Sequence, residues 1–204
     1  AEAMTLPERI VLATGNPGKV REIRRILGEV GVEIVPQTEL GVGDADETGT
    51  SFLENALIKA RHAADLTGLP AIADDSGLVV DALDGRPGVY SARYAGAAAS
   101  DDDNIEKLLH ELRGVADDKR TAAFHGCAVY VSADDSTSLV AEGRWQGRIL
   151  GERRGTGGFG YDPVFFDPEC GRSAAELGPE LKNARSHRGK ALAALAEMLR
   201  QHYA

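Results

Sequence analysis

The chain has 204 residues, 43% of them hydrophobic, which suits one domain with a sizeable core and is short for two. Its formal net charge of −9 argues against general affinity for nucleic acid polymers or anionic membranes, although a single phosphorylated small molecule remains compatible with it. Two cysteines without zinc-like spacing fit a reducing cytoplasm, and no apolar run approaches the roughly 18 residues that span a bilayer. We expect a single two-lobed domain over residues 1–204, in which residues 1–8 could form a disordered tail.

The first predicted element is a buried strand at residues 10–13, followed by Thr14-Gly15-Asn16-Pro17-Gly18-Lys19 and a helix with apolar residues at helical spacing. Asn16 suits an N-cap and Pro17 the first helical position. Free backbone N–H groups and the positive end of the helix dipole would then face an anion beyond the strand. A generic helix start explains the same residues, and the segment is not a Walker A loop, because no Ser or Thr follows Lys19.

After a predicted strand at residues 33–35, residues 41–49 form an acidic, glycine-rich loop that contains Glu47. Ser51 and Glu54 then show the capping-box pattern of a helix start, so we expect Glu54 to close that helix end and not to act in catalysis. Asn55, Lys59 and His62 share one side of this helix. Exposure to solvent is the default expectation for that side.

Residues 71–77 combine a short apolar run with Asp74, Asp75 and Ser76, and Gly77 allows a turn before the apolar residues 78–80. Neighbouring residues on an extended chain point to opposite faces, so Asp74 and Asp75 should have different roles. One can anchor the structure while the other meets a ligand. A polar turn between two strands is the plain alternative.

Further along, a surface helix is expected at residues 101–113, and strands at residues 121–131 and 138–145 are expected to form a hairpin. The segment 155–163 then places several glycines around Phe159 and Tyr161. Glycine packs poorly in a core, whereas a backbone that passes close to a flat base beside an aromatic ring is a common nucleotide-binding arrangement. A flexible loop is the alternative.

Basic residues gather at positions 180–190, before a predicted C-terminal helix with leucines at 192, 195 and 199. The side chains of Lys182, His187 and Arg188 offer donors for an anion or a carbonyl oxygen. Ser186 capping the helix, with His187 and Arg188 in its exposed first turn, explains the same pattern without a ligand.

Taken in chain order, six of these segments resemble the inosine/xanthosine triphosphate pyrophosphatase family over nearly the whole chain. The segments are Thr14-Gly15-Asn16-Pro17-Gly18-Lys19, Glu47-Thr48-Gly49, Phe52-Leu53-Glu54-Asn55-Ala56, Ala73-Asp74-Asp75-Ser76-Gly77, Gly157-Gly158-Phe159-Gly160-Tyr161-Asp162-Pro163 and Ser186-His187-Arg188-Gly189. The resemblance implies an α/β fold, with an elongated mixed β-sheet flanked by helices and two lobes around a central nucleotide cleft. It also implies a homodimer and Mg²⁺-dependent hydrolysis of ITP, dITP and XTP to the monophosphate and pyrophosphate, which clears deaminated purines from the nucleotide pool.

Within that resemblance, Glu47 and Asp75 are the expected Mg²⁺ ligands, because this ion is commonly held by one or two carboxylates together with substrate phosphates. By similarity to the family, Asp75 is also the general base. Asp74 is expected either to support the turn or to bind the metal through a water. Lys19 and Lys59 would neutralise the triphosphate during the reaction, and Lys19 counts with Asp75 as catalytic. The complete set of expected substrate contacts is Thr14, Gly15, Asn16, Pro17, Gly18, Lys19, Lys59, Ser76, Phe159, Gly160, Tyr161, Asp162, Lys182, His187 and Arg188.

Base selection is expected from donors around a purine stacked on Phe159. His187, Arg188 and Lys182 can donate to a 6-oxo group, whereas the 6-amino group of adenine would leave them unpaired. Guanine has a 6-oxo group and must be excluded through its 2-amino group. Two other hypotheses stay open: a related pyrophosphatase for methylated or pyrimidine nucleotides, and a non-catalytic nucleotide sensor that uses the same pocket.

Overall fold

The computed structural model describes residues 5–204 and divides into two compact units. Unit 1 contains the chain up to Asp75, together with Gly126–Gly143 and the C-terminal segment that begins at His187. Unit 2 contains Ser76–His125 and Arg144–Ser186. Of the tail expected at residues 1–8, residues 1–4 lie outside the described part of the chain, while Leu6 packs against the core of unit 1.

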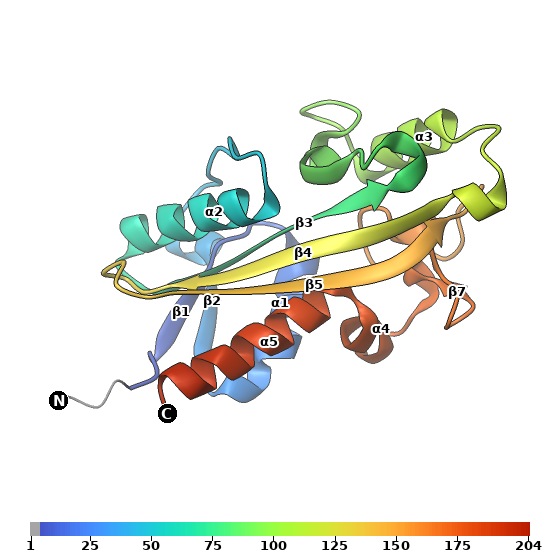
Figure 1. Cartoon of the computed structure of the whole chain (residues 1–204). Coiled ribbons are helices and arrows are strands. Elements are labelled where there is room, and N and C mark those ends of the chain that lie inside the picture. The colour runs from blue at the N-terminus through green and yellow to red at the C-terminus, as the bar shows by residue number, and fades with distance from the viewer. Residues whose placement is uncertain (1–4) are drawn as a thin grey trace. The chain divides into compact units, whose positions relative to one another are not determined.

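The strands form one seven-stranded sheet in the order β2-β1-β3-β4-β5-β6-β7 (Figure 1). Strand β1 is parallel to β2 and β3, whereas β6 is antiparallel to β5 and β7, so the sheet is mixed. The predicted α/β class with a mixed sheet is confirmed. The strands are β1 (Arg9–Leu12), β2 (Glu33–Pro36), β3 (Ala71–Val80), β4 (Thr121–Val131), β5 (Ser138–Ile149), β6 (Phe165–Asp167) and β7 (Arg172–Ser173).

Five α-helices accompany these strands in the described part of the chain, and short 3-10 helices occur in the connections. None of the helices within residues 5–204 combines the length and the apolar character that crossing a bilayer requires. The α-helices are α1 (Pro17–Leu27), α2 (Phe52–Thr67), α3 (Asp101–Glu111), α4 (Pro179–Arg185) and α5 (His187–His202).

Unit 1 is built on the alternation of side chains along its strands. On β1, Ile10 and Leu12 pack with leucines of α1 and α5, whereas Val11 and its neighbour Ala13 pack with the alanines of α2. On β3, Ile72 belongs to the first cluster, and Ala71 and Ala73 belong to the second. Helix α2 therefore covers one face of these strands and α1 with α5 the other, as Figure 1 shows. Continuing the alternation, Asp74 falls on the α1/α5 face and Asp75 on the α2 face.

Strand β3 runs without interruption from Ala71 to Val80, so the turn expected at Gly77 is wrong. Gly77 is not among the glycines of the described chain that have positive φ. The strand has a neighbour on each side in the sheet, and this tertiary pairing overrides the local turn signal of an Asp-Ser-Gly sequence. The two carboxylates are consequently held by a central strand.

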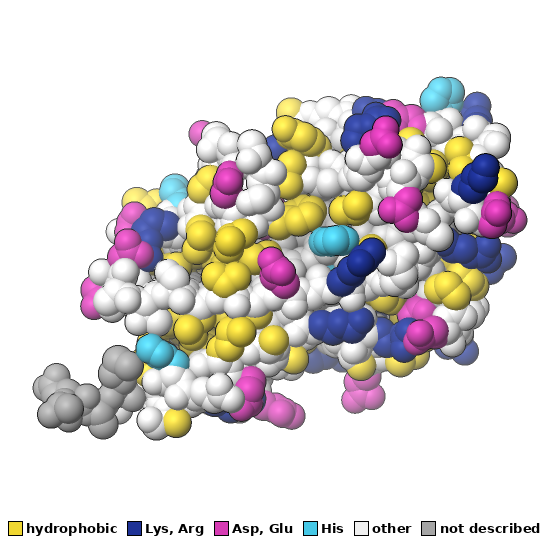
Figure 2. Space-filling view, in the orientation of Figure 1, with side chains coloured by type: hydrophobic (Ala, Val, Ile, Leu, Met, Phe, Trp, Pro, Cys, Tyr) yellow, Lys and Arg dark blue, Asp and Glu magenta, His cyan; other side chains and the backbone are white. Residues whose placement is uncertain are grey.

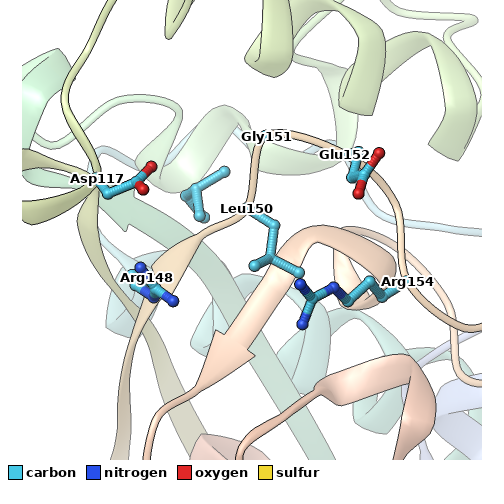
Figure 3. Close-up of a pocket in the computed structure, with 7 residues that line it drawn as sticks. Asp117, Arg148, Leu150, Gly151, Glu152 and Arg154 are labelled. Atoms are coloured by element: carbon cyan, nitrogen blue, oxygen red, sulfur yellow. The ribbon is translucent and has the colours of Figure 1, made fainter.

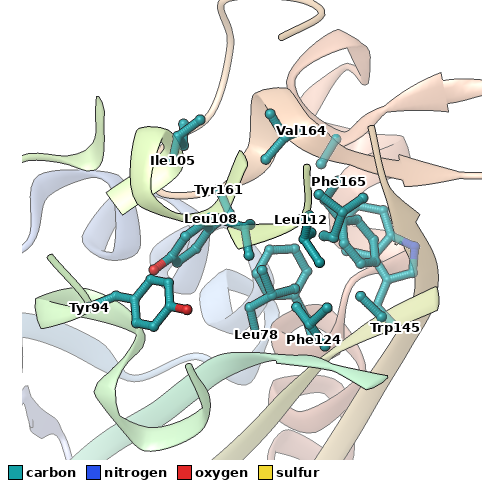
Figure 4. Close-up of a cluster of buried hydrophobic side chains, with 14 of the residues drawn as sticks. Leu78, Tyr94, Ile105, Leu108, Leu112, Phe124, Trp145, Tyr161, Val164 and Phe165 are labelled. Carbon is teal, nitrogen blue, oxygen red and sulfur yellow. The ribbon is translucent and has the colours of Figure 1, made fainter. Parts of the chain in front are cut away.

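Unit 2 has its own core of large side chains (Figure 4). The rings of Phe124, Trp145 and Phe165 contact one another, with ring centroids 4.5 Å apart for Phe124 and Phe165 and 4.9 Å apart for Trp145 and Phe165. The expected helix at residues 101–113 is present and ends at Glu111, and it packs Leu108 into this core. The core supports the loop that contains Phe159.

Acidic and basic side chains are interspersed on the face of the molecule shown in Figure 2. This distribution agrees with the formal net charge of −9.

Candidate active site

Asp74 and Asp75 face different partners, as the alternation along β3 predicts. Asp74 lies 2.9 Å from Nε of Arg188 and 3.7 Å from Nζ of Lys19, on the side of α5 and α1. Asp75 accepts a hydrogen bond of 3.0 Å from Nζ of Lys59 on α2. The prediction that the two carboxylates have separate surroundings is confirmed.

Asp74 is an ionised carboxylate held by two basic side chains, although its Oδ1, 3.7 Å from Nζ of Lys19, has no hydrogen-bond partner among the described residues. Burial acts to raise the pKa of its carboxyl, but the positive charges of Arg188 and Lys19 outweigh burial and hold the pKa far below the usual range. Arg188 also pairs with Glu22, at 2.8 Å from Nη1 to Oε2. Burial alone would lower the pKa of Arg188, yet Asp74 and Glu22 raise it. Asp74 therefore stays ionised, which suits the supporting role expected for it.

Asp75 has the opposite character. Burial raises the pKa of its carboxyl, Lys59 counteracts the rise, and the charge of Glu47 adds to it. Its Oδ2 atom is buried and has no hydrogen-bond partner among the described residues. A buried carboxylate oxygen without a partner is costly, so it marks a position where a water, a metal ion or a substrate group can bind.

Lys59 links the two expected metal ligands. Its Nζ lies 2.8 Å from Oε1 of Glu47 and 3.0 Å from Oδ1 of Asp75. Burial acts to lower the pKa of Lys59, but the carboxylates of Asp75, Asp74 and Glu47 raise it overall, so the side chain is positively charged. The default expectation that this side of α2 is solvent-exposed is wrong, because the loop that contains Glu47 covers it.

Glu47 and Asp75 fit a magnesium ion that takes its remaining ligands from substrate and water. Within residues 5–204, no group of three or more His, Cys, Asp or Glu side chains is arranged to hold a metal ion by itself. Mg²⁺ needs only one or two carboxylates when phosphates and water complete its shell. Asp75 Oδ2 is unpartnered among the described residues, and Asp75 lies beside Glu47 on the shared ammonium group of Lys59, so this pair of carboxylates fits such an ion.

In the turn before α1, the predicted helix cap is confirmed, but several of the backbone N–H groups expected to bind an anion already have hydrogen-bond partners. Asn16 is the N-cap and Pro17 begins the helix. However, Oδ1 of Asn16 already accepts from the backbone N–H groups of Gly18 (2.9 Å) and Lys19 (3.2 Å), and the N–H of Asn16 donates to Oγ1 of Thr14. The expectation of free N–H groups at this helix start is therefore wrong for Asn16, Gly18 and Lys19, because side chains of the turn already satisfy these three donors.

Lys19 is the basic side chain of this turn, and it lies beside Asp74. Its side chain is 19% exposed, and burial lowers its pKa while Asp74 opposes the shift. A phosphate at this end of α1 would therefore meet the ammonium group of Lys19 more readily than the occupied amides.

In unit 2, Phe159, Asp162 and Lys182 form one cluster. Asp162 Oδ2 accepts from the N–H of Phe159 (3.0 Å) and from Nζ of Lys182 (2.7 Å), and that Nζ lies 4.7 Å from the centroid of the Phe159 ring. Gly158 has φ +71°, and a Cβ on it would lie 2.1 Å from Oδ2 of Asp162. This close approach requires glycine, and it brings together Phe159 and Lys182, which the sequence predicts for base binding, with Asp162, another expected substrate contact.

Two other predicted contacts of this segment have different surroundings. Tyr161 is buried in the unit 2 core, where its hydroxyl donates to the carbonyl of Ser91 (2.6 Å), so its ring serves packing. Gly160 donates its N–H to Oδ2 of Asp101 (2.9 Å), which ties the loop to the start of α3. Ser76 follows Asp75 on β3 and is half-buried.

His187 and Arg188 form the buried first turn of α5, so an exposed first turn is excluded. Two glycines let this turn approach the strands. A Cβ on Gly143 would lie 2.1 Å from the carbonyl oxygen of His187, and one on Gly126 would lie 3.0 Å from its Cδ2. The sequence did not reveal that Arg188 pairs with Asp74, since the two residues are 114 positions apart and no local pattern connects them.

A separate cavity of about 300 Å³ lies within unit 2 (Figure 3). Its walls include Arg148, Arg154, Asp117 and Glu152, and none of the residues predicted for the site line it. This cavity is therefore separate from the cluster around Asp75 in unit 1 and from the cluster around Phe159 in unit 2.

A comparison with protein families places the chain. The sequence profile of the Ham1 family matches residues 10–198. The chain belongs to the Ham1 family. Its curated relatives from Pectobacterium atrosepticum and Salmonella typhimurium, both named dITP/XTP pyrophosphatase, are 60% and 59% identical over 194 residues, which is 95% of this chain and 98% of each relative. The resemblance inferred from the sequence motifs is thereby confirmed.

Solved Ham1 structures show the same fold. A HAM1 protein from Coxiella burnetii superposes with a TM-score of 0.86 at 48% identity, covering 96% of this chain and all of that one. The Staphylococcus aureus Ham1 protein gives a TM-score of 0.83 at 38% identity, with 95% and 99% covered. The mixed sheet with flanking helices is therefore a Ham1 fold.

Proposed function

We propose that this protein hydrolyses the triphosphates of deaminated purines, namely ITP, dITP and XTP, to the monophosphate and pyrophosphate. The observation that carries the proposal is the buried, unpartnered Oδ2 of Asp75, beside Lys59 and Glu47, in a Ham1 chain. Relatives named dITP/XTP pyrophosphatase at 60% and 59% identity support the same reaction.

In the proposed reaction, Asp75 takes a proton from water as the water oxygen attacks the α-phosphorus. The bond from that phosphorus to the bridging oxygen breaks, and pyrophosphate leaves with the oxygen. Burial raises the pKa of Asp75, which makes it a better proton acceptor than an ordinary surface carboxylate. Lys59 and Lys19 provide fixed positive charge for the triphosphate.

Glu47 and Asp75 would hold Mg²⁺, since the two carboxylates already share the Lys59 ammonium group and one Asp75 oxygen has no partner. When bound, the ion would neutralise phosphate charge and lower the pKa of a coordinated water. Asp74, paired with Arg188 and Lys19, keeps this end of β3 in place.

For the base, we propose stacking on Phe159 and donation from Lys182 and His187 to the 6-oxo group. Support comes from the Phe159, Asp162 and Lys182 cluster, in which Asp162 holds Lys182 beside the ring. Arg188 is engaged by Asp74 and Glu22, so we assign it to holding Asp74 in preference to binding the base. The remaining expected contacts stay predictions: Thr14, Gly15, Asn16, Pro17, Gly18, Ser76, Gly160 and Tyr161.

The test is a substrate panel of ITP, dITP, XTP, ATP and GTP with Mg²⁺, in which pyrophosphate and single phosphate are measured separately. We expect pyrophosphate from the first three and at least about a 100-fold lower kcat/KM for ATP, because unpaired buried donors reject the 6-amino group. Release of single phosphate, or equal rates for ATP, would contradict the proposal. Methylated and pyrimidine nucleotides in the same panel test the related pyrophosphatase, and binding without turnover would indicate a sensor.

We also propose a homodimer located in the cytoplasm. The family resemblance supports the dimer, and the cysteine usage supports a reducing compartment. Sedimentation equilibrium of the purified chain tests the dimer, since a monomer at micromolar concentration would contradict it.

A further inference from the structure

One face of α2 contacts the acidic loop, residues 43–49, at three successive points. Asn55 accepts a hydrogen bond from the N–H of Gly49 (2.8 Å), Lys59 pairs with Glu47 (2.8 Å), and Nε2 of His62 lies 3.1 Å from the carbonyl oxygen of Gly43. These three residues are spaced four and three positions apart, which places them in one row along a helix. Figure 1 shows the chain before α2 folded back against this helix.

The acidic loop has little internal support of its own. It contains no helix or strand, and within the described chain the one backbone hydrogen bond inside residues 43–49 joins the N–H of Thr48 to the carbonyl of Asp46. Contacts from outside the loop therefore hold it in place: Gln37 Nε2 donates to Oδ1 of Asp44 (3.0 Å), and Lys59 pairs with Glu47 itself (2.8 Å). The contact nearest to Glu47 on its C-terminal side is the one from Asn55 to Gly49.

Asn55 is built into the structure more tightly than a surface helix residue. Its side chain is 0% exposed, and its Nδ2 atom is buried without a hydrogen-bond partner. A Cβ on Gly49 would lie 2.7 Å from Oδ1 of Asn55 and 2.7 Å from Cβ of Glu54, so the loop approaches as closely as a glycine allows. A leucine or alanine would suit this buried position better if packing were its only role.

We propose that Asn55 is a positioning residue for the reaction. By accepting the Gly49 N–H, it fixes the acidic loop so that Glu47 stays beside Lys59 and Asp75, ready to share a divalent cation with Asp75. This inference rests on the proposed function only for the catalytic readout. The anchoring of the loop and the binding of the cation can be measured without any turnover.

The closing experiment compares Asn55→Ala with Asn104→Ala. Asn104 is a matched control, since it is 3% exposed on α3, accepts from the N–H of Ala95 (2.8 Å) and donates to the carbonyl of Ala92 (3.0 Å) within unit 2. Amide hydrogen exchange of residues 43–50, Mg²⁺ titration of the substrate-free protein by calorimetry, and the Mg²⁺ concentration for half-maximal dITP hydrolysis are measured for both variants.

We expect Asn55→Ala to speed exchange in residues 43–50 and to weaken Mg²⁺ binding by about 10-fold to 100-fold, the range seen when residues that orient metal ligands are removed. The half-maximal Mg²⁺ concentration should rise by a similar factor, with the KM for dITP at saturating Mg²⁺ unchanged. Asn104→Ala should leave all three readouts as in the wild type. Asn55→Asp keeps the acceptor for the Gly49 N–H and should restore slow exchange.

Unchanged exchange and unchanged Mg²⁺ binding in Asn55→Ala would overturn the inference, as would equal changes in Asn104→Ala. If Asn55→Ala does not fold, Gly49→Ala tests the same inference, because its added methyl group displaces the contact between Gly49 and Asn55. Wild-type Mg²⁺ binding in Gly49→Ala would also overturn the inference. A wild-type protein that releases no pyrophosphate from dITP would refute the proposed function, while exchange and calorimetry would still test the anchor.

Discussion

Two buried aspartates, one in each unit, show how differently the same side chain can be used. In unit 2, Asp167 is 1% exposed and accepts from Trp145 (2.9 Å), from Nε of Arg185 (2.5 Å) and from the N–H of Glu169 (3.0 Å), so both oxygens have partners. In unit 1, Asp75 is also buried, yet its Oδ2 has no partner among the described residues.

The pKa values of these two carboxyls move in opposite directions. Burial acts to raise both, but the hydrogen bonds from Arg185 and Trp145 lower the pKa of Asp167 to about 2, whereas at Asp75 burial prevails. A carboxylate whose two oxygens both have hydrogen-bond partners stabilises its surroundings, whereas one with an unpartnered oxygen is available to bind a ligand. Asp74 lies between these two cases, because its Oδ1 has no hydrogen-bond partner among the described residues, yet the charges of Arg188 and Lys19 keep the pKa of its carboxyl low.

The largest effect is expected from Asp75→Asn. The amide cannot accept a proton from water, so kcat for dITP should fall by about 1,000-fold or more. Because burial disfavours the ionised form at this site, the free energy of unfolding should stay within about 1 kcal/mol of the wild type. Pyrophosphate release and urea unfolding measure the two quantities. Full activity of Asp75→Asn, or a large loss of its stability, would contradict the assignment of Asp75 to the reaction and of Asp167 to the structure.

Asp167→Asn should give the reverse pattern. Losing the charge breaks the pair with Arg185 and sets an amide among donors, at a cost of about 3 kcal/mol in the free energy of unfolding. The melting temperature should fall by about 10 °C, with kcat at 25 °C nearly unchanged. Calorimetry and steady-state kinetics check both, and an unchanged melting temperature would show that the cluster is not structural.

The smallest effect concerns acid stability. The pKa of Asp167 is about 2 in the folded protein, below the value of about 3.9 in an unfolded chain. Its contribution is therefore fully present above the unfolded value and is lost as pH falls toward the folded one. Between pH 6 and pH 3, the difference in unfolding free energy between wild type and Asp167→Asn should shrink by about 1 kcal/mol. A constant difference across this range would contradict the assigned pKa.

Much of the fold followed from local patterns. Apolar periodicity predicted α1, α2, α3 and α5, and Asn16 with Pro17 predicted the start of α1. The turn expected at Gly77 failed because neighbouring strands on both sides hold β3 extended, and sheet pairing is decided by residues far away in the chain.

For the candidate site, too, some features could be predicted from local sequence patterns, and others depend on segments far apart in the chain. That Asp74 and Asp75 should have different surroundings followed from alternation along one strand, which needs no tertiary information, whereas the general-base role of Asp75 came from the family resemblance. The pairing of Arg188 with Asp74 and the burial of Asn55 under the acidic loop each depend on distant segments meeting. Helical spacing identified Asn55, Lys59 and His62 as one row, but it could not say that a loop would cover that row.

The two glycines behind His187 have a consequence for anyone who alters this protein. A methyl group on Gly143 would collide with the backbone of His187 at the start of α5. We expect the collision to move the start of this helix, together with the Arg188 guanidinium that pairs with Asp74. Gly126 on β4 and Gly143 on β5 are therefore positions at which even one added methyl group would press on His187 and could displace the neighbouring Arg188 from Asp74.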